Sequence, residues 1–311
     1  MSVPLVSELF TNWINSSEIT LAEQVGNGSY GVVHKGLFRG QEVAVKKIKP
    51  EHNLSFETEL KQLSRVSAHP NIVNLLGAVR DNGFLSLVME FARGGSLYEV
   101  LHSEVPVLYS LTDAISWAHQ CATGVAYLHS MRPKAIVHRD LKSPNLLLVN
   151  GRVIKICDFG TACDKRTIMT INTGSARWMA PEVFESCKYT EKCDVYSWAI
   201  ILWEVLARQV PYEWLEANDQ CILWAVHTGK RPPLMYNCPE VIEILMTKCW
   251  SKDPAIRPSM HDVVVRMGKV VKGMTHSNDI NKWCLISYSR GVNSSANSRS
   301  DDNISDLKDT S

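Results

Sequence analysis

The sequence predicts a two-lobed α+β fold, in which a β-rich N-lobe precedes a larger helical C-lobe. Residues 18–89 alternate short apolar strands with one helical pattern, whereas helical patterns dominate from residue 96 onward. The change falls at an extended segment, 90–95, that ends in two glycines. We therefore expect an N-terminal extension at 1–17, a domain at 18–274 with lobes 18–89 and 96–274 joined by a hinge at 90–95, and a disordered tail at 275–311.

The first motif of the N-lobe is glycine-rich and reads Gly26-Asn27-Gly28-Ser29-Tyr30-Gly31. Residues without a Cβ allow the backbone to close over phosphate groups. The motif lacks the Gly-Lys-Ser/Thr ending of a P-loop, which disfavours a Walker-type NTPase. A dinucleotide-binding fold would place an acidic residue about 20 residues later, after a βαβ pattern. Here a short strand, Val43-Ala44-Val45-Lys46, follows instead, and we interpret Lys46 as a phosphate-binding lysine.

A helix is expected after this strand, over residues 54–66. Phe56, Leu60 and Leu63 follow the i, i+4, i+7 spacing of one helix face. A glutamate beside that face could pair with Lys46, and Glu51, Glu57 and Glu59 compete for this role. We favour Glu59, which lies four residues before Leu63, and expect the other two to be solvated.

The C-lobe carries four longer helical patterns and three motifs. The helices are expected at 111–129, 193–207, 220–227 and 240–250. The motifs are His138-Arg139-Asp140-Leu141-Lys142-Ser143-Pro144-Asn145, then Asp158-Phe159-Gly160, then Ala180-Pro181-Glu182. Phosphoryl transfer requires a carboxylate to orient the attacking hydroxyl, oxygen ligands for magnesium, and positive charge on the phosphates. Asp140, Asn145, Asp158 and Lys142 supply these groups.

Composition and charge exclude several other classes of function. A net charge of +1 implies no bulk attraction to nucleic acid or to a membrane surface. The most apolar run, 198–203, is too short to span a bilayer and is closed by Glu204. Nine cysteines without paired spacing are typical of reduced thiols. With no leader pattern in residues 1–20, we expect a cytoplasmic location.

Together the glycine-rich loop, Lys46 and the three C-lobe motifs resemble those of protein kinases. Lys142 is typical of serine/threonine kinases and opposes a tyrosine-specific enzyme, while Trp178 is of the kind shared with tyrosine kinases. The chain is therefore similar to the tyrosine-kinase-like group. Over residues 18–270 it resembles the family of TGF-beta-activated kinases, which are MAP kinase kinase kinases, most closely at 60–66, 124–131, 157–164 and 249–254.

The resemblance implies ATP and Mg²⁺ as cofactors and MAP kinase kinases as substrates, in stress or immune signalling. Asp140 would orient the hydroxyl and Lys142 would contact the moving phosphoryl, while Asn145 and Asp158 would hold magnesium. Lys46 and Glu59 would form the ion pair of the N-lobe. The implied ATP pocket comprises Gly26, Asn27, Gly28, Ser29, Tyr30, Gly31, Val33, Ala44, Lys46, Met89, Glu90, Ala92 and Leu147.

Structural and regulatory roles follow from the same resemblance. Glu182 and Arg257 would form a buried ion pair, Asp194 would cap the catalytic-loop backbone, and Leu63, Leu75, His138 and Phe159 would form an apolar column between the lobes. Arg139 would pair with a phosphate on the activation segment, at Thr170 with Thr167 as an accessory site. Ser175 would hydrogen-bond the catalytic aspartate and lysine.

Some alternatives remain open at this point. A nucleotide-binding scaffold without catalysis usually lacks Lys46, Asp140 or Asp158, and all three are present here. The resembling family carries a long C-terminal extension with a coiled coil, whereas residues 275–311 show no heptads. The sequence does not decide whether an activating subunit is required.

Overall fold

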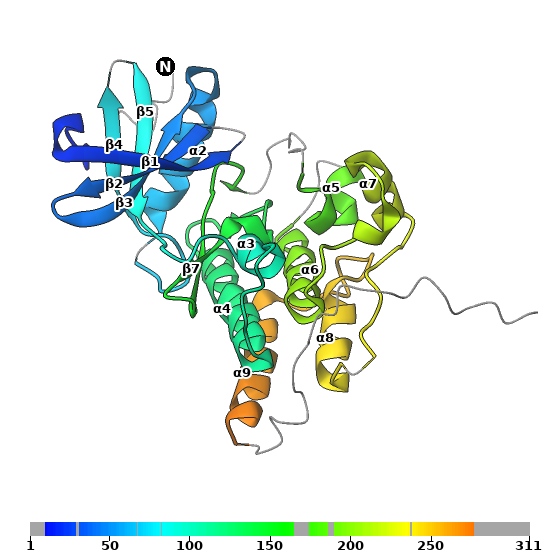
Figure 1. Cartoon of the computed structure of the whole chain (residues 1–311). Coiled ribbons are helices and arrows are strands. Elements are labelled where there is room, and N and C mark those ends of the chain that lie inside the picture. The colour runs from blue at the N-terminus through cyan, green and yellow to red at the C-terminus, as the bar shows by residue number, and fades with distance from the viewer. Residues whose placement is uncertain are drawn as a thin grey trace, which may run out of the picture.

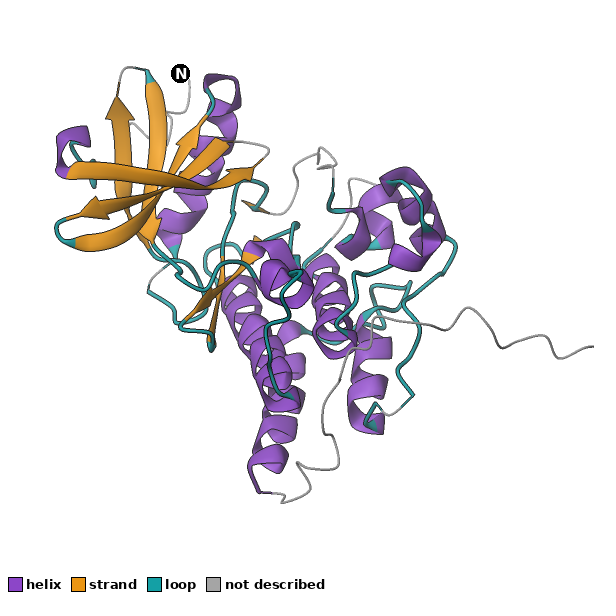
Figure 2. Cartoon of the chain, in the orientation of Figure 1, coloured by secondary structure: helices purple, strands orange, loops and turns teal. Residues whose placement is uncertain are grey.

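The computed structural model describes residues 10–276, apart from 29–30, 67, 82, 165–173, 186–189 and 237. It has a sheet-based lobe and a helical lobe (Figures 1 and 2), which confirms the predicted bilobal α+β fold. The N-lobe sheet is antiparallel, with strand order β1-β2-β3-β5-β4. Its strands are β1 (Ile19–Gly28), β2 (Gly31–Phe38), β3 (Gln41–Ile48), β4 (Leu75–Asp81) and β5 (Phe84–Glu90).

Successive side chains of β3 lie on opposite faces of the sheet, in two different environments. Val43 and Val45 are buried on one face of the sheet, where they pack in a small cluster with Val88. Because successive side chains of a strand point to opposite faces, Ala44 and Lys46 lie on the other face. The strand thus presents its lysine on the face opposite to this small core.

Helix α2 (Asn53–Arg65) packs against β4 and β5. It lies at the expected place and buries the expected face, with Phe56 and Leu60 at 0% exposure and Leu63 at 3%. Glu59 is buried within the same helix at 0% exposure. A carboxylate in such a position requires a partner, and the strand lysine supplies it.

The chain before β1 also packs on the sheet. Ile14 joins the small cluster on the outer face of the sheet, and its amide donates to Ala78 O at 2.8 Å. The Arg80 guanidinium lies 4.9 Å from the ring centroid of Trp13. A Cβ on Gly77 would approach Ile14 to 2.6 Å, so glycine allows this segment to lie close to β4. Part of the expected N-terminal extension therefore completes the N-lobe core.

The C-lobe is built around a buried helix. Almost every side chain of α6 (Lys192–Ala207) is buried, because its sequence lacks a polar face. Helix α4 (Leu111–Ser130) contacts α6 and α9 (Met260–His276). The other helices are α3 (Leu97–His102), α5 (Pro181–Glu185), α7 (Asp219–His227) and α8 (Glu240–Cys249). The four helices expected from the sequence are present, with ends displaced by one residue at most.

Two small two-stranded sheets lie where the lobes meet. Strand β7 (Leu146–Val149) pairs with β8 (Val153–Ile156), and β6 (Ile136–Val137) pairs with β9 (Cys163–Asp164). The motif at 138–145 fills the connection between β6 and β7, and the motif at 158–160 lies between β8 and β9. Strand pairing therefore brings the two motifs together. Within the described segments, no helix has both the length and the apolar character needed to cross a bilayer.

Candidate active site

The glycine-rich motif forms the end of the β1–β2 hairpin. Gly26 pairs with Val33, Asn27 with Val32, and Gly28 with Gly31. A Cβ on Gly31 would lie 2.1 Å from Lys47 O, so only glycine permits this approach of β2 to β3. Ser29 and Tyr30 lie outside the described residues. The glycines were expected to lie over phosphates, and the structure adds a packing requirement for Gly31.

Lys46 joins the two lobes through carboxylates. Its Nζ lies 3.0 and 2.8 Å from the two oxygens of Glu59 and 2.9 Å from Oδ1 of Asp158. The structure thus pairs Lys46 with Glu59, the glutamate favoured over Glu51 and Glu57. One ammonium group thus holds a helix of the N-lobe and the loop after β8 in one arrangement.

Burial and charge set the protonation of this cluster. Burial by itself lowers the pKa of Lys46, but the charges of Asp158 and Glu59 outweigh it and the net pKa is raised. Burial also opposes ionisation of Asp158, yet the Lys46 charge holds the pKa of that carboxyl below its usual value. Lys46 is therefore a cation and Asp158 an anion at neutral pH, as phosphate and metal binding require.

The catalytic-loop side chains converge around Asp140, which is 4% exposed. The Asn145 amide donates to Asp140 O at 2.8 Å and to its Oδ2 at 3.2 Å. Lys142 Nζ lies 3.1 Å from the same Oδ2 and donates to Ser175 Oγ at 2.7 Å. Ser175 is thus bonded to Lys142, whereas no bond from Ser175 to Asp140 is found among the described residues. The carboxylate is held in place by an amide and an ammonium group.

Asn145 and Asp158 are suited to hold a divalent cation. The pairing of Leu146 with Ile156 and the bond from Cys157 N to Asn145 O at 3.0 Å place them side by side. Asn145 uses its amide nitrogen toward Asp140, which leaves its side-chain oxygen as an acceptor. Asp158 engages Lys46 through Oδ1 and retains Oδ2. One carboxylate and one amide oxygen, completed by phosphate oxygens, is a typical ligand set for Mg²⁺.

Two site residues adopt an uncommon backbone conformation. Asp158 has a φ of 63° and Arg139 a φ of 69°, both in the left-handed region. Such conformations cost about 1–3 kcal/mol in non-glycine residues and are found where function requires them. Around Arg139, Asp194 offsets this cost by accepting from His138 N at 2.9 Å and from Arg139 N at 2.8 Å.

The region expected to bind adenine lies at the end of β5. Met89 is 6% exposed and pairs with Ala44 in the sheet register. Leu147 is half-buried between the buried Leu146 and Leu148, on the opposite lobe. The Glu90 carboxylate accepts from Asn74 N at 2.7 Å and pairs with Lys155 at 2.8 Å, so its side chain braces the hinge. Ala92 follows in the half-buried hinge segment.

Several of the supporting contacts expected from the sequence are present. Arg257, 1% exposed, donates to both carboxylate oxygens of Glu182 at 2.6 and 2.8 Å. The rings of His138 and Phe159 lie 5.1 Å apart, and His138 Nε2 lies 3.0 Å from Cys157 O. His138 is thus a packing and hydrogen-bonding residue, as expected.

The contacts of two buried carboxylates, Asp194 and Glu204, include partners that the sequence did not predict. His129 Nε2 lies 2.9 Å from Asp194 Oδ2. Glu204 is fully buried and bonds Ser143 and Trp178. The signal for Glu204 was present, since a lone acidic residue at the end of an apolar run is a candidate for a buried, hydrogen-bonded carboxylate. Thr167 and Thr170, the proposed regulatory sites, lie outside the described residues.

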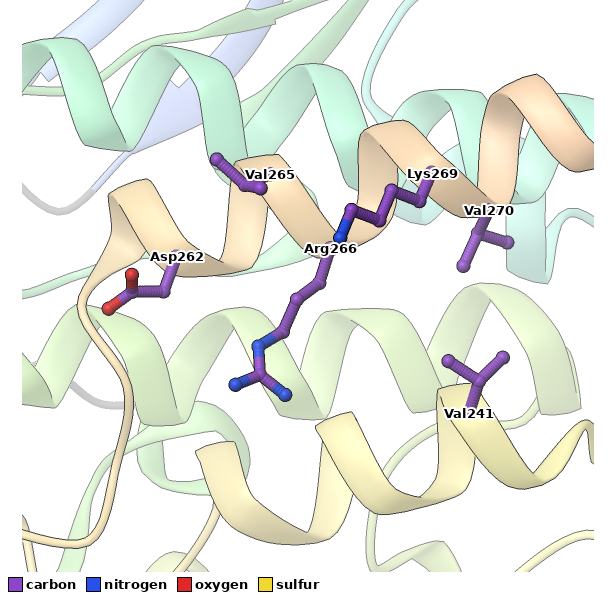
Figure 3. Close-up of a pocket in the computed structure, with 6 residues that line it drawn as sticks. All are labelled: Val241, Asp262, Val265, Arg266, Lys269 and Val270. Atoms are coloured by element: carbon purple, nitrogen blue, oxygen red, sulfur yellow. The ribbon is translucent and has the colours of Figure 1, made fainter.

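A groove of about 600 Å³ lies between α8 and α9 (Figure 3). Val241 contributes from α8, and α9 contributes Asp262, Val265, Arg266, Lys269 and Val270. None of the residues that line it belongs to the cluster around Lys46 and Asp140. The groove is therefore separate from the candidate active site.

Comparison with known proteins agrees with this geometry. Residues 19–267 match the family described as "Protein tyrosine and serine/threonine kinase". "Mitogen-activated protein kinase kinase kinase 7" of Homo sapiens is 56% identical over 266 residues, which cover 85% of this chain and 42% of the relative. The protein of that name from Drosophila melanogaster is 51% identical over 288 residues, or 92% of this chain and 42% of the relative.

A "Putative mitogen-activated protein kinase kinase kinase 7-like" of Drosophila melanogaster is 38% identical over 277 residues, covering 86% of this chain and 70% of the relative. The chain spans less than half the length of the two more similar relatives. Its match to the family, by contrast, covers both lobes and every element of the candidate site. The chain therefore belongs to the protein tyrosine and serine/threonine kinase family.

Proposed function

We propose that this chain transfers the γ-phosphoryl group of ATP to serine or threonine hydroxyls of MAP kinase kinases. The observation that carries the proposal is the cluster in which Lys46 bonds both Glu59 and Asp158 while Asp140 is held by Asn145 and Lys142. Members of the family use ATP and typically Mg²⁺. The similar relatives are named as MAP kinase kinase kinases, which supports MAP kinase kinases as the substrate class.

Each side chain has a role in this reaction that its contacts support. Lys46 orients the α- and β-phosphates, and Glu59 keeps the ammonium group in place. Asp140 orients the substrate hydroxyl and accepts its proton, while Lys142 neutralises charge on the moving phosphoryl. Asn145 and Asp158 would hold Mg²⁺, which neutralises charge on the phosphates when bound.

The geometry favours catalysis over a role as a nucleotide-binding scaffold. A scaffold has no requirement for an ordered carboxylate at the hydroxyl site, yet Asp140 is bonded by both Asn145 and Lys142. Lys142, rather than alanine or arginine, supports serine and threonine over tyrosine as acceptors. The proposed cytoplasmic location is supported by the free thiols among the described residues, which are Cys121, Cys157, Cys193, Cys221, Cys238 and Cys249.

The direct test is purified protein with magnesium ATP and a panel of MAP kinase kinases, followed by phosphoamino acid analysis. We expect phosphoserine or phosphothreonine on at least one panel member. Asp140→Asn should abolish transfer but leave ATP binding largely intact, since the amide keeps the shape and loses the charge. Near-normal transfer by this variant would refute the catalytic assignment. Transfer that appears only after a partner protein is added would show that an activating subunit is required.

Regulation by phosphorylation is part of the same proposal. Arg139 precedes the catalytic Asp140, and kinases with this arginine order the activation segment by pairing it with a phosphate. We propose autophosphorylation at Thr170, with Thr167 as an accessory site. Thr170→Ala should lose most activity, and Arg139→Ala should lose the response to phosphorylation. Full activity of Thr170→Ala after phosphatase treatment would place the switch elsewhere.

A further inference from the structure

A buried carboxylate in the C-lobe connects three segments that surround the candidate active site. Glu204 of α6 is 0% exposed. Its Oε1 accepts from Ser143 Oγ at 2.7 Å and lies 2.9 Å from Nε2 of His102, while its Oε2 accepts from Trp178 Nε1 at 2.8 Å. Hydrogen bonds to a buried charge are strong, and their loss leaves an unsatisfied charge in the interior.

The donors to Glu204 flank a contact of the catalytic machinery. Ser143 directly follows Lys142, and Trp178 lies three residues after Ser175. Lys142 Nζ in turn donates to Ser175 Oγ at 2.7 Å. The contacts therefore form a closed ring from Glu204 through the catalytic loop to residues 174–180 and back. Because the two oxygens of a carboxylate have a constant separation, the ring sets the distance between these two segments.

The third partner extends the ring to α3. The Tyr98 ring lies 4.6 Å from that of His102 and 6.4 Å from that of Trp178. Burial and then the negative charge of Glu204 raise the pKa of Tyr98. The carboxylate is thus surrounded by aromatic side chains, which exclude water and make each hydrogen bond more difficult to replace.

We propose that Glu204 is a positioning residue for phosphoryl transfer. Its carboxylate holds the catalytic loop, through Ser143, in register with residues 174–180, through Trp178. Lys142 and Ser175 can then meet while substrate is bound. Glu204 does not touch the reacting atoms and acts through these two side chains. The inference rests on the proposed kinase function, because positioning is measured against that reaction.

Two substitutions remove single donors without removing the buried carboxylate. Ser143→Ala deletes the hydroxyl on the catalytic loop, and Trp178→Phe deletes the indole N–H while keeping an aromatic ring. The matched control is Trp198→Phe. Trp198 is buried, as Trp178 is, but it lies on α6, and its Nε1 donates to Ala118 O at 2.8 Å, toward α4 and away from the ring of contacts. The control therefore loses the same kind of bond, an indole N–H donated to an oxygen, at a position on α6 outside the ring of contacts.

Steady-state kinetics should separate the two positions. We expect Ser143→Ala to lower kcat about tenfold, equivalent to about 1.4 kcal/mol, and Trp178→Phe to raise KM for the protein substrate by a similar factor. KM for ATP should change little in either, and Trp198→Phe should keep wild-type constants. The factor by which the double variant lowers kcat/KM should be smaller than the product of the factors for the two single variants, because both substitutions interrupt the same ring of contacts. Glu204→Gln should retain more activity than Glu204→Ala, since its carbonyl can still accept from Trp178.

A second measurement needs no activity. Hydrogen exchange of Ser143→Ala should show faster exchange at residues 174–180, and that of Trp178→Phe at residues 138–145, whereas Trp198→Phe should change neither. The inference would be overturned if both variants lowered the melting temperature as the control does, kept wild-type kinetics, and showed no faster hydrogen exchange in the opposite segment of the ring. A wild-type protein that phosphorylates no panel member, either alone or with a partner protein added, would refute the proposed function instead, and the exchange data would still decide whether Glu204 couples the segments.

Discussion

Replacing Glu182 by glutamine should destabilise the C-lobe much more than an equivalent change in a surface ion pair. Glu182 accepts two bonds from Arg257, whose side chain is fully buried. Removing one partner of a buried pair costs roughly 3–5 kcal/mol. In the variant the Arg257 guanidinium keeps its bonds to the carbonyl groups of Lys192, Ser251 and Lys252. We therefore expect a loss of unfolding free energy at the lower end of this range, about 3 kcal/mol.

Thermal unfolding measures this difference directly. For a domain of about 250 residues, 1 kcal/mol shifts Tm by about 2–4 °C, so Glu182→Gln should lower Tm by about 6–12 °C. The control is Glu18→Gln, because the pair of Glu18 with Arg39 is solvent-exposed, with side chains 38% and 72% exposed. Exposed pairs contribute roughly 0–1 kcal/mol. Equal shifts for the two variants would refute the view that the Glu182–Arg257 pair anchors the segment after residue 180.

Three further predictions test the site. Lys46→Met should lower kcat by at least about 100-fold through lost phosphate positioning, with transfer assays and an ATP titration separating turnover from binding. The pKa of Asp194 lies below its ordinary value of 3.8, because hydrogen bonds from His129 and from the catalytic-loop backbone outweigh the effect of burial. The contribution of Asp194 to folding stability is therefore complete above pH 3.8 and is lost as the pH falls further. Urea unfolding should thus show a constant deficit for Asp194→Asn from pH 7 to about 4.5 that shrinks below pH 3.8, and shrinkage already at pH 6 would contradict the assignment. Burial and the negative charge of Asp158 raise the pKa of the Cys157 thiol, so we expect it to resist free alkylating agents. It should react, however, with an electrophile carried by an ATP-site ligand. Equal amounts of adduct on wild type and Cys157→Ser, measured by intact-protein mass spectrometry, would exclude this reaction.

The sequence predicted the parts of the site whose chemistry depends on local spacing. Gly26, Lys46 and Asp140 belong to motifs of a few residues each, and the fold class followed from where strand patterns give way to helical ones. The selection of Glu59 depended on helix periodicity, and the structure pairs that residue with Lys46 at 2.8 Å. Such features can be predicted from the sequence because the geometry between neighbouring residues is nearly constant in a strand or a helix.

Only the tertiary structure showed how these motifs are held together. Glu204 meets its partners across 26, 61 and 102 residues of sequence. Ile14 joins the sheet core through a bond to Ala78, 64 residues away. His129 reaches Asp194 from a different helix. No spacing rule links such positions, because the packing of α4 against α6 and of residues 12–14 against the sheet determines which buried polar groups find partners. The sequence by itself thus determined which reacting groups are present, and the fold decided which side chains hold them in place.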